Sequence, residues 1–216
     1  MRFLATTLFF FIVLNGNSQD PGRFKSDVDH IQKKYDTLWD ATKETTLFTG
    51  SSSIRIWKDL ENRFPNDQIV NSGFGGSHAS DLLAFSNELI LKYKPSKVFI
   101  YEGDNDIASG KKPRDIIRTI EQIVHTIRTG EPKTKIILIS AKPSLSRWSL
   151  RHKYQRLNKK LQRLCKKNAL TEYANVWDPM LRKRKPIPDL FIEDGLHMNT
   201  KGYDIWHSVL EPFTKH

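Results

Sequence analysis

Three consecutive serines, at positions 51–53, follow a short apolar segment and a glycine. Residues 45–49 favour a β-strand, Gly50 permits backbone angles that other residues avoid, and apolar residues recur at helical spacing over residues 54–60. The pattern predicts a strand, a tight turn and a helix. Serines at a helix N-terminus lie beside unpaired backbone N–H groups, which favour negative charge. One of them could therefore act as a nucleophile with an oxyanion site beside it, although such a run is also typical of a simple helix cap.

Histidines that follow a carboxylate by three residues are candidates for the general base that a serine nucleophile requires. Such pairs are Asp27/His30, Asp194/His197 and Asp204/His207. The first and third pairs fall inside helical patterns, where this spacing is typical of surface charges. Asp194 and His197 instead lie in a glycine-containing loop after the last predicted strand. We therefore predict that Asp194 and His197 act on the serine.

Strand and helix patterns alternate along the chain. The expected strands are residues 45–49, 68–71, 97–101, 135–140 and 173–176, and the clearest helices are residues 21–43, 113–128, 147–167 and a last one from residue 200. This alternation predicts a three-layer α/β/α sandwich around a five-stranded parallel sheet. Ligands bind at the carboxyl ends of such strands. The serine turn, the Gly75–Gly76 turn and the Asn105 loop each follow a strand, so we expect them to converge at one edge.

Four separated blocks of sequence resemble the SGNH (GDSL-type) hydrolase superfamily. They are residues 48–53, 71–76, 103–106 and 194–197. Their order and spacing both match, and the resemblance covers nearly the whole chain after its first residues. It implies a flavodoxin-like sandwich and hydrolysis of esters without a cofactor.

The resemblance also implies a role for individual residues. Ser52 would be the nucleophile, His197 the general base and Asp194 the acid that orients it. The backbone N–H groups of Ser52 and Gly76 and the side-chain amide of Asn105 would form the oxyanion hole.

The chain departs from this family at the residue before the nucleophile, where Ser51 stands in place of the usual aspartate. This change removes no member of the proposed triad, so Ser52 remains the expected nucleophile, and Ser51 and Ser53 are the lesser alternatives. Ile54 occupies the place of the second glycine in a GxSxG elbow, which disfavours the α/β-hydrolase fold.

Three carboxylates, Glu102, Asp104 and Asp106, follow the third predicted strand. They could bind a hard cation through oxygen, but the sequence has no twelve-residue calcium loop and no HExxH or CxxC pattern. We predict that the protein uses no metal and no other cofactor.

The first residues have the pattern of an export signal. Arg2 precedes an uncharged run over residues 3–14, and residues 15–18 are small or polar. We expect a signal peptide over residues 1–18 that is cleaved near Ser18, leaving one exported domain over residues 19–216. The uncharged run is shorter than the ~20 residues that span a bilayer, so no stable membrane span is expected. The only cysteine, Cys165, cannot form an internal disulfide and should pack as a small apolar side chain.

The chain is basic, with 35 Lys and Arg against 24 Asp and Glu, a formal net charge of +11. Many of the cations lie in the predicted helix 147–167 and at residues 182–185. The simplest interpretation is a solvated helix face, and the alternative is a surface for an anionic glycan or phospholipid headgroup. Nucleic acid is not expected, because an exported protein meets little of it. Trp148 either covers the core or stacks on a sugar ring, and we favour the first.

Together these patterns predict an exported serine esterase that acts through an acyl-enzyme. A short acyl group, such as O-acetyl on a carbohydrate, is the favoured substrate. The alternatives are a lysophospholipase or thioesterase with the same three residues, a non-catalytic module that binds an anion, and a surface protein that works through its basic helix.

Overall fold

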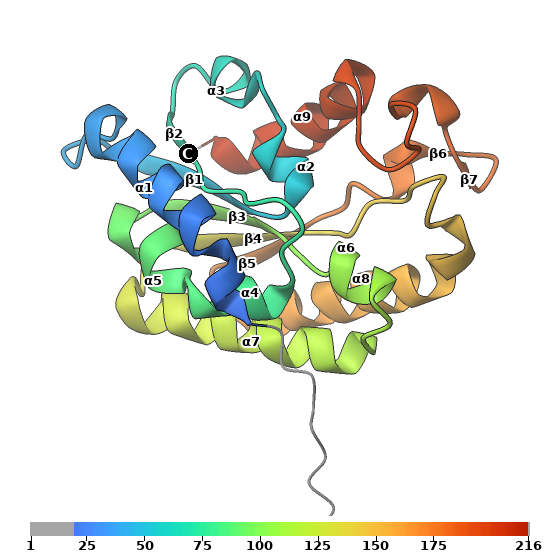
Figure 1. Cartoon of the computed structure of the whole chain (residues 1–216), viewed down its shortest axis with the longest axis horizontal. Helices are drawn as coiled ribbons and strands as arrows, with labels where there is room; N and C mark the ends of the chain where they lie inside the picture. The colour runs from blue at the N-terminus through green and yellow to red at the C-terminus, as the bar shows by residue number, and fades with distance from the viewer. Residues whose placement is uncertain (1–19, 216) are drawn as a thin grey trace, which may run out of the picture.

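Five parallel strands form the centre of the computed structural model, which describes residues 20–215 (Figure 1). The strands are β1 (Thr45–Gly50), β2 (Gln68–Asn71), β3 (Lys97–Tyr101), β4 (Lys135–Ile139) and β5 (Thr171–Ala174). They pair in the order β2-β1-β3-β4-β5, and every neighbouring pair is parallel. The predicted five-stranded parallel sheet is therefore confirmed. The predicted signal peptide, residues 1–18, lies outside the described residues.

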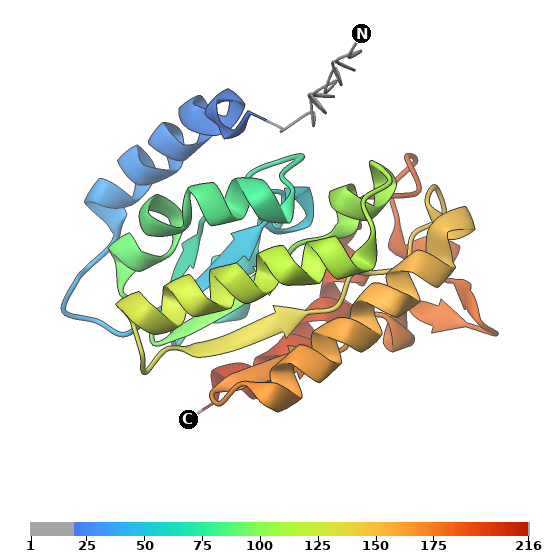
Figure 2. The same ribbon diagram turned by 90° about the horizontal axis from the view of Figure 1, so that it is seen from below.

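Helices cover both faces of the sheet. One face carries α1 (Lys25–Leu38), α4 (Ala79–Ala84), α5 (Ser86–Leu89), α7 (Pro113–Gly130) and α8 (Arg151–Lys167), and the other carries α2 (Ser52–Arg55), α3 (Leu60–Arg63) and α9 (Thr200–Thr214). Figure 2 shows α7 and α8 side by side against the sheet. Successive strand residues point to opposite faces. Leu47 and Val98 therefore enter one core, and Phe48 and Phe99 enter the other, where their rings stack 4.4 Å apart. The structure is the predicted three-layer α/β/α sandwich.

Smaller elements complete the chain. They are the 3-10 turns at Pro21–Phe24, Leu91–Tyr93, Trp148–Leu150, Asp178–Met180 and Pro188–Leu190, the short helix α6 (Asp104–Ala108) and the hairpin of β6 (Leu181–Arg182) and β7 (Lys185–Pro186). Within residues 20–215 no helix is long and apolar enough to cross a membrane.

The structure shifts or divides several predicted elements. Strand β5 begins and ends two residues before the predicted 173–176. It ends early because the backbone N–H of Val176 donates to the Ser140 hydroxyl at 2.9 Å and not to the backbone of the neighbouring strand. The helix expected from residue 54 divides into α2 and α3. The helical segment before β3 is likewise divided, into α4 and α5, and there the Ser86 hydroxyl donates to the carbonyl of Leu82 at 2.8 Å. The first helix ends at Leu38 rather than at residue 43.

Two single residues behave as the sequence indicates. Cys165 is buried among apolar side chains, and burial raises the pKa of its thiol to about 12. Trp148 packs against the core and stacks on Trp177, with ring centroids 5.9 Å apart. Its ring therefore covers the core, as favoured.

Candidate active site

The turn after β1 places the three serines at the carboxyl edge of the sheet. Gly50 ends β1 with a φ of +126°, and a Cβ there would lie 2.0 Å from the carbonyl oxygen of Tyr101 on the neighbouring strand. No other residue fits this close approach. Ser51 precedes α2, and Ser52 is its first residue. The backbone N–H of Ser52 has no acceptor among residues 20–215, as is usual for the first turn of a helix.

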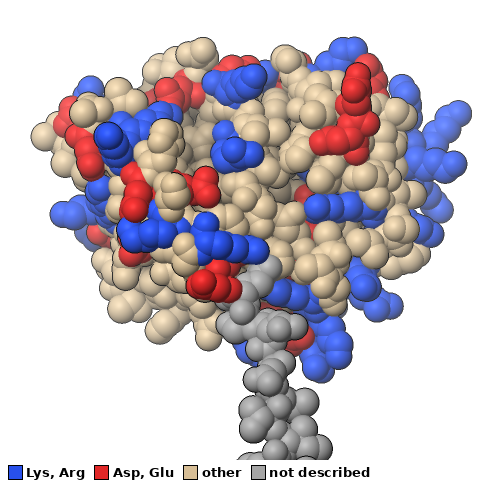
Figure 3. Space-filling view, viewed as in Figure 1, with Lys and Arg blue, Asp and Glu red and all other residues tan. Residues whose placement is uncertain are grey.

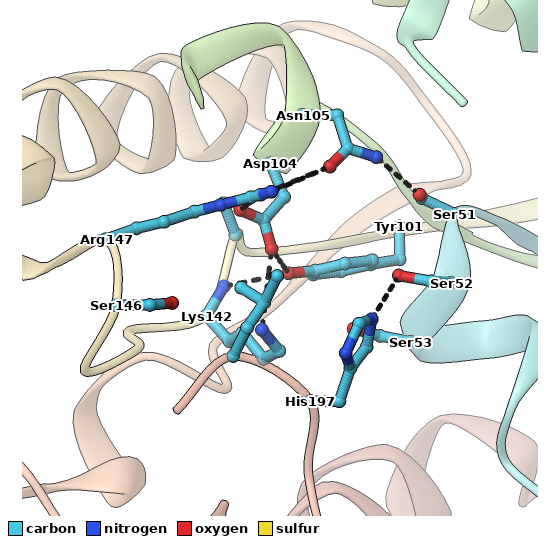
Figure 4. A network of polar contacts seen from close by, with 12 residues as sticks. Ser51, Ser52, Ser53, Tyr101, Asp104, Asn105, Lys142, Ser146, Arg147 and His197 are labelled. Carbon is cyan, nitrogen blue, oxygen red and sulfur yellow. Dashed lines mark hydrogen bonds and ion pairs between the residues drawn. The ribbon is translucent and has the colours of Figure 1, made fainter. Parts of the chain in front are cut away.

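Ser52 is the serine whose hydroxyl meets a histidine. Its Oγ lies 2.9 Å from Nε2 of His197 (Figure 4). Ser53 is buried and its carbonyl accepts a hydrogen bond from the Tyr203 hydroxyl, while the Ser51 hydroxyl accepts one from the Asn105 amide. Of the three candidates, Ser52 alone is placed for proton transfer to an imidazole.

The loop between β7 and α9 holds His197 and Asp194 together. Nδ1 of His197 lies 2.5 Å from one carboxylate oxygen of Asp194, and the other oxygen accepts the backbone N–H groups of Leu196 and His197 at 2.8 and 2.9 Å. Gly195, with a φ of +63°, makes this tight loop possible. A carboxylate only accepts hydrogen bonds, so the imidazole proton lies on Nδ1 and Nε2 is free to accept the proton of Ser52. Burial raises the pKa of Asp194, but the hydrogen bonds from His197 and from the backbone outweigh it, and the pKa is lowered.

Asn105 lies in the first turn of α6, not in a loop as expected. Gly103 starts this helix with a φ of +102°, and a Cβ on it would lie 2.7 Å from the side chain of Leu157. The Asn105 amide nitrogen donates to the Ser51 hydroxyl at 2.7 Å and to the carbonyl of Ser77 at 3.0 Å. These bonds join the turns after β1, β2 and β3. The predicted convergence at one edge of the sheet is thus confirmed.

Gly76 lies in the turn after β2 with a φ of +83°. A Cβ on it would meet nothing within 4 Å, so its surroundings are open. Its backbone N–H has no acceptor in the part of the chain that the structure describes. Gly76 and Ser52 therefore both offer free donors at this edge.

Arg147 is a site residue that the sequence pattern did not indicate. Its sequence position predicts that it belongs to the basic surface of residues 147–167. Its side chain is only 21% exposed, however, and both of its terminal nitrogens lie 3.2 Å from the amide oxygen of Asn105. Arg147 lies in the segment that follows the carboxyl end of β4. This position after a parallel strand was the one feature of the sequence that could have indicated a residue of the site. Arg147 therefore fixes which way the Asn105 amide faces, with its N–H groups toward Ser51 (Figure 4).

Asp104 holds Arg147 in place from inside the protein. Its carboxylate accepts from Arg147 and from the Tyr154 hydroxyl at 2.6 Å each and from the Tyr101 hydroxyl at 2.9 Å, and Nζ of Lys142 lies 3.4 Å away. Burial raises the pKa of Asp104, but the charges of Lys142 and Arg147 more than offset it, and the pKa is about 2. Burial lowers the pKa of Lys142, whose side chain is fully buried. The result is a charged, hydrogen-bonded cluster beneath Asn105.

The three carboxylates considered for a cation bind different partners. Glu102 accepts the Ser77 hydroxyl, Asp104 holds the cluster just described, and Asp106 pairs with Lys111 at 3.0 Å. Burial raises the pKa of Glu102 well above its usual value, and the nearby charge of Asp106 adds to the effect. Residues 20–215 contain no group of three His, Cys, Asp or Glu side chains that could hold a metal ion.

Known proteins share this fold. The chain superposes on the GDSL-like lipase of Bacteroides thetaiotaomicron with a TM-score of 0.73 and 20% identity, covering 90% of this chain and 96% of that one. The lipase/acylhydrolase of Enterococcus faecalis gives a TM-score of 0.66 and 20% identity, over 79% and 94% of the two chains. A carbohydrate esterase family 3 protein of Talaromyces cellulolyticus gives 0.65 and 17%, over 79% and 96%.

Sequence comparison identifies the family. Curated protein sequences give no match. The profile of the GDSL-like lipase/acylhydrolase family matches residues 36–205, which include every residue of the site described above. The chain therefore belongs to the GDSL-like lipase/acylhydrolase family.

Proposed function

We propose that the protein is a serine esterase that hydrolyses carboxylic oxygen esters through an acyl-enzyme. The observation that carries this proposal is the unbroken series from Asp194 through His197 to Ser52, with hydrogen-bond distances of 2.5 and 2.9 Å. A serine hydroxyl is a weak nucleophile unless a base removes its proton, and this series supplies the base and its orienting acid.

The first half of the reaction forms the acyl-enzyme. Ser52 Oγ attacks the ester carbonyl while Nε2 of His197 takes its proton, and Asp194 stabilises the resulting imidazolium. The imidazolium then gives the proton to the departing alkoxide. In the second half, His197 takes a proton from water, which attacks the acyl-enzyme, and the proton returns to Ser52 as the acid is released.

The free backbone N–H groups of Ser52 and Gly76 support an oxyanion hole at this edge. Each such donor contributes on the order of 3 kcal/mol to transition-state stabilisation. The amide nitrogen of Asn105 is the proposed third donor. Both of its hydrogens are engaged, with Ser51 and Ser77. To bind the oxyanion, Asn105 must therefore share or release the hydrogen that it donates to Ser51.

A short acyl group on a carbohydrate is our proposed substrate. It rests on the likeness of the fold to a carbohydrate esterase family 3 protein, alongside lipases and acylhydrolases. A lysophospholipid or a thioester is the alternative with the same chemistry. We further propose that the chain acts after export, as its first 18 residues indicate.

Hydrolysis of p-nitrophenyl acetate, butyrate and a long-chain ester by the purified protein tests the reaction. We expect Ser52→Ala and His197→Ala each to lower kcat on the order of 10⁶-fold, to background, as in other serine hydrolases. Ser53→Ala is the matched control, because Ser53 is buried next to Ser52, while the hydroxyl that lies 2.9 Å from Nε2 of His197 is that of Ser52. Activity that survives Ser52→Ala would refute the assignment. A preference for acetate over the longer esters would support the short acyl group.

A further inference from the structure

A groove beside the middle of α8 is lined almost entirely by cations. It has a volume of about 560 Å³ and lies between the start of α7 and the exposed face of α8. Its charged lining residues are Lys112, Arg114, Arg156, Lys159, Lys160 and Arg163. Lys and Arg outnumber Asp and Glu at the lower right of Figure 3, where Figure 1 places α8 and the start of α7. The lining contains no acidic residue.

Five of the six groove cations have no ion-pair partner in the described part of the chain, whereas many other surface cations do. Arg114 lies 3.3 Å from Asp115, but the other five have no ion-pair partner within residues 20–215. Elsewhere Lys92, Lys135 and Lys201 pair with carboxylates at 2.6 to 2.8 Å. Like charges at neighbouring helical positions repel each other and destabilise a helix. An anion in the groove would relieve this repulsion.

The positions of the cations suit an extended ligand. Residues 156, 159, 160 and 163 recur at steps of three and four, so they share one face of α8. This face runs for about 10 Å along the helix axis. The first turn of α7, an 18-residue helix, adds the positive end of its dipole. The positive field therefore extends along a line and is not concentrated at a single point.

The composition of the lining selects the kind of anion. It has no aromatic side chain, which stacking on nucleic-acid bases would require. It also lacks a large apolar side chain that could enter a bilayer, since the exposed ones in the described part of the chain are Leu38, Leu145, Leu170 and Ile192. The groove can therefore bind a ligand mainly through its positive charges, which line a concave surface. We propose that this groove binds a linear anionic polysaccharide that carries sulfate or carboxylate groups. Such binding uses none of the residues assigned to ester hydrolysis, so it stands or fails separately from the proposed function.

Titration calorimetry with heparin and with polygalacturonate tests the proposal on the full purified chain. We expect both polymers to bind, and the affinity to fall steeply as NaCl rises from about 0.05 to about 0.5 M, because screening weakens contacts between exposed charges. The variant R156Q/K159Q/K160Q/R163Q should lose affinity at least about tenfold, which is a loss of roughly 1.4 kcal/mol or more.

The hairpin of β6 and β7 supplies a matched control. Its residues Arg182, Lys183, Arg184 and Lys185 are also exposed cations without ion pairs in the described structure. The variant R182Q/K183N/R184N/K185Q removes an equal number of positive charges, four, and Asn suits the left-handed backbone of residues 183 and 184. Thermal unfolding checks that both variants remain folded. We expect this control to keep its affinity for the polysaccharides.

Three outcomes would overturn the proposal. The wild-type protein fails to bind either polymer, or both variants lose affinity equally, which would mean that only net charge matters. The third is that vesicles containing anionic phospholipid bind through residues 156–163 while neither polysaccharide does, which would assign the groove to a membrane surface.

Discussion

Two carboxylates flank the active site, and they are held in opposite ways. Asp194 lies in a surface loop with 42% of its side chain exposed, and its partners are His197 three residues away and two backbone N–H groups. Asp104 is 7% exposed, and its partners come from β3, the segment after β4, and α8. The pKa of each carboxyl is lowered, against the effect of burial. Hydrogen bonds lower that of Asp194, and the charges of Lys142 and Arg147 lower that of Asp104.

This difference separates the chemistry of the site from its framework. An exposed ion pair adds little to the stability of the fold, so we expect Asp194 to act mainly through His197. Removing one partner of a buried ion pair costs about 3 to 5 kcal/mol, so Asp104 and its partners stabilise the fold. Arg147 connects the two regions, because it bonds to both Asp104 and Asn105. Substitutions should therefore act on rate at one carboxylate and on stability at the other.

Among the variants that test this difference between Asp194 and Asp104, we expect Asp194→Asn to change kcat most. The amide no longer accepts the Nδ1 proton as a carboxylate does, so His197 adopts the wrong tautomer and kcat falls by about 10⁴-fold. The thermal midpoint should stay within about 1 °C of wild type, because the pair is exposed. Asp189→Asn, which removes another exposed loop carboxylate, is the control and should leave kcat unchanged. A large loss of stability in Asp194→Asn would contradict the claim that Asp194 acts on the rate and Asp104 on the stability of the fold.

Asn105→Ala should have the next largest effect. Loss of one oxyanion donor lowers kcat by about 10²- to 10³-fold, with little change in KM, because the bond forms only in the transition state. Steady-state kinetics with p-nitrophenyl acetate measure both constants. Asn66→Ala, in a surface loop, controls for loss of an amide elsewhere. A rise in KM at constant kcat would instead assign Asn105 to substrate binding.

Arg147 tests whether the buried framework controls the chemistry. Without it the Asn105 amide is free to turn, and we expect Arg147→Met to lower kcat by about 10- to 100-fold and to lower the thermal midpoint. Arg147→Lys restores a positive charge beside Asp104 but not the two-pronged contact with Asn105. It should therefore recover stability more fully than kcat. If Arg147→Met destabilises the protein and leaves kcat unchanged, Arg147 is structural only.

The dependence of stability on acid pH should distinguish Asp104 from Asp194 by the smallest expected effect. The pKa of Asp104 is lowered from 3.8 to about 2, so this carboxyl contributes stability that is present above pH 4 and is lost as the pH falls to 2. The contribution is about 2 kcal/mol. Urea unfolding between pH 5 and pH 2 should show this loss in wild type and in Asp194→Asn. In Asp104→Asn the free energy of unfolding should fall less steeply between pH 5 and pH 2. An unchanged dependence on pH would contradict the proposed role of Asp104 in stability.

Local patterns were sufficient for much of the site. Strands β2 and β3 have the predicted bounds, because each is a short apolar segment that ends at polar or glycine residues. The parallel topology brings the ends of strands to one edge, so the meeting of Ser51 with Asn105 followed from the order of elements. Asp194 and His197 were identifiable because their contact spans only three residues of a glycine-containing loop.

Long-range contacts decided the rest. Arg147 reads as the first cation of a basic helix, and its true partner, Asp104, lies 43 residues away in sequence. The start of the Asn105 helix at Gly103, which packs against Leu157, and the early end of β5 likewise depend on contacts from other segments. Sequence by itself determined the alternation of strands and helices, the family and the local Asp194–His197 pair, because these depend on spacing along the chain. The tertiary structure alone decided which charges are buried and paired, because that free energy depends on groups that only the folded chain brings together.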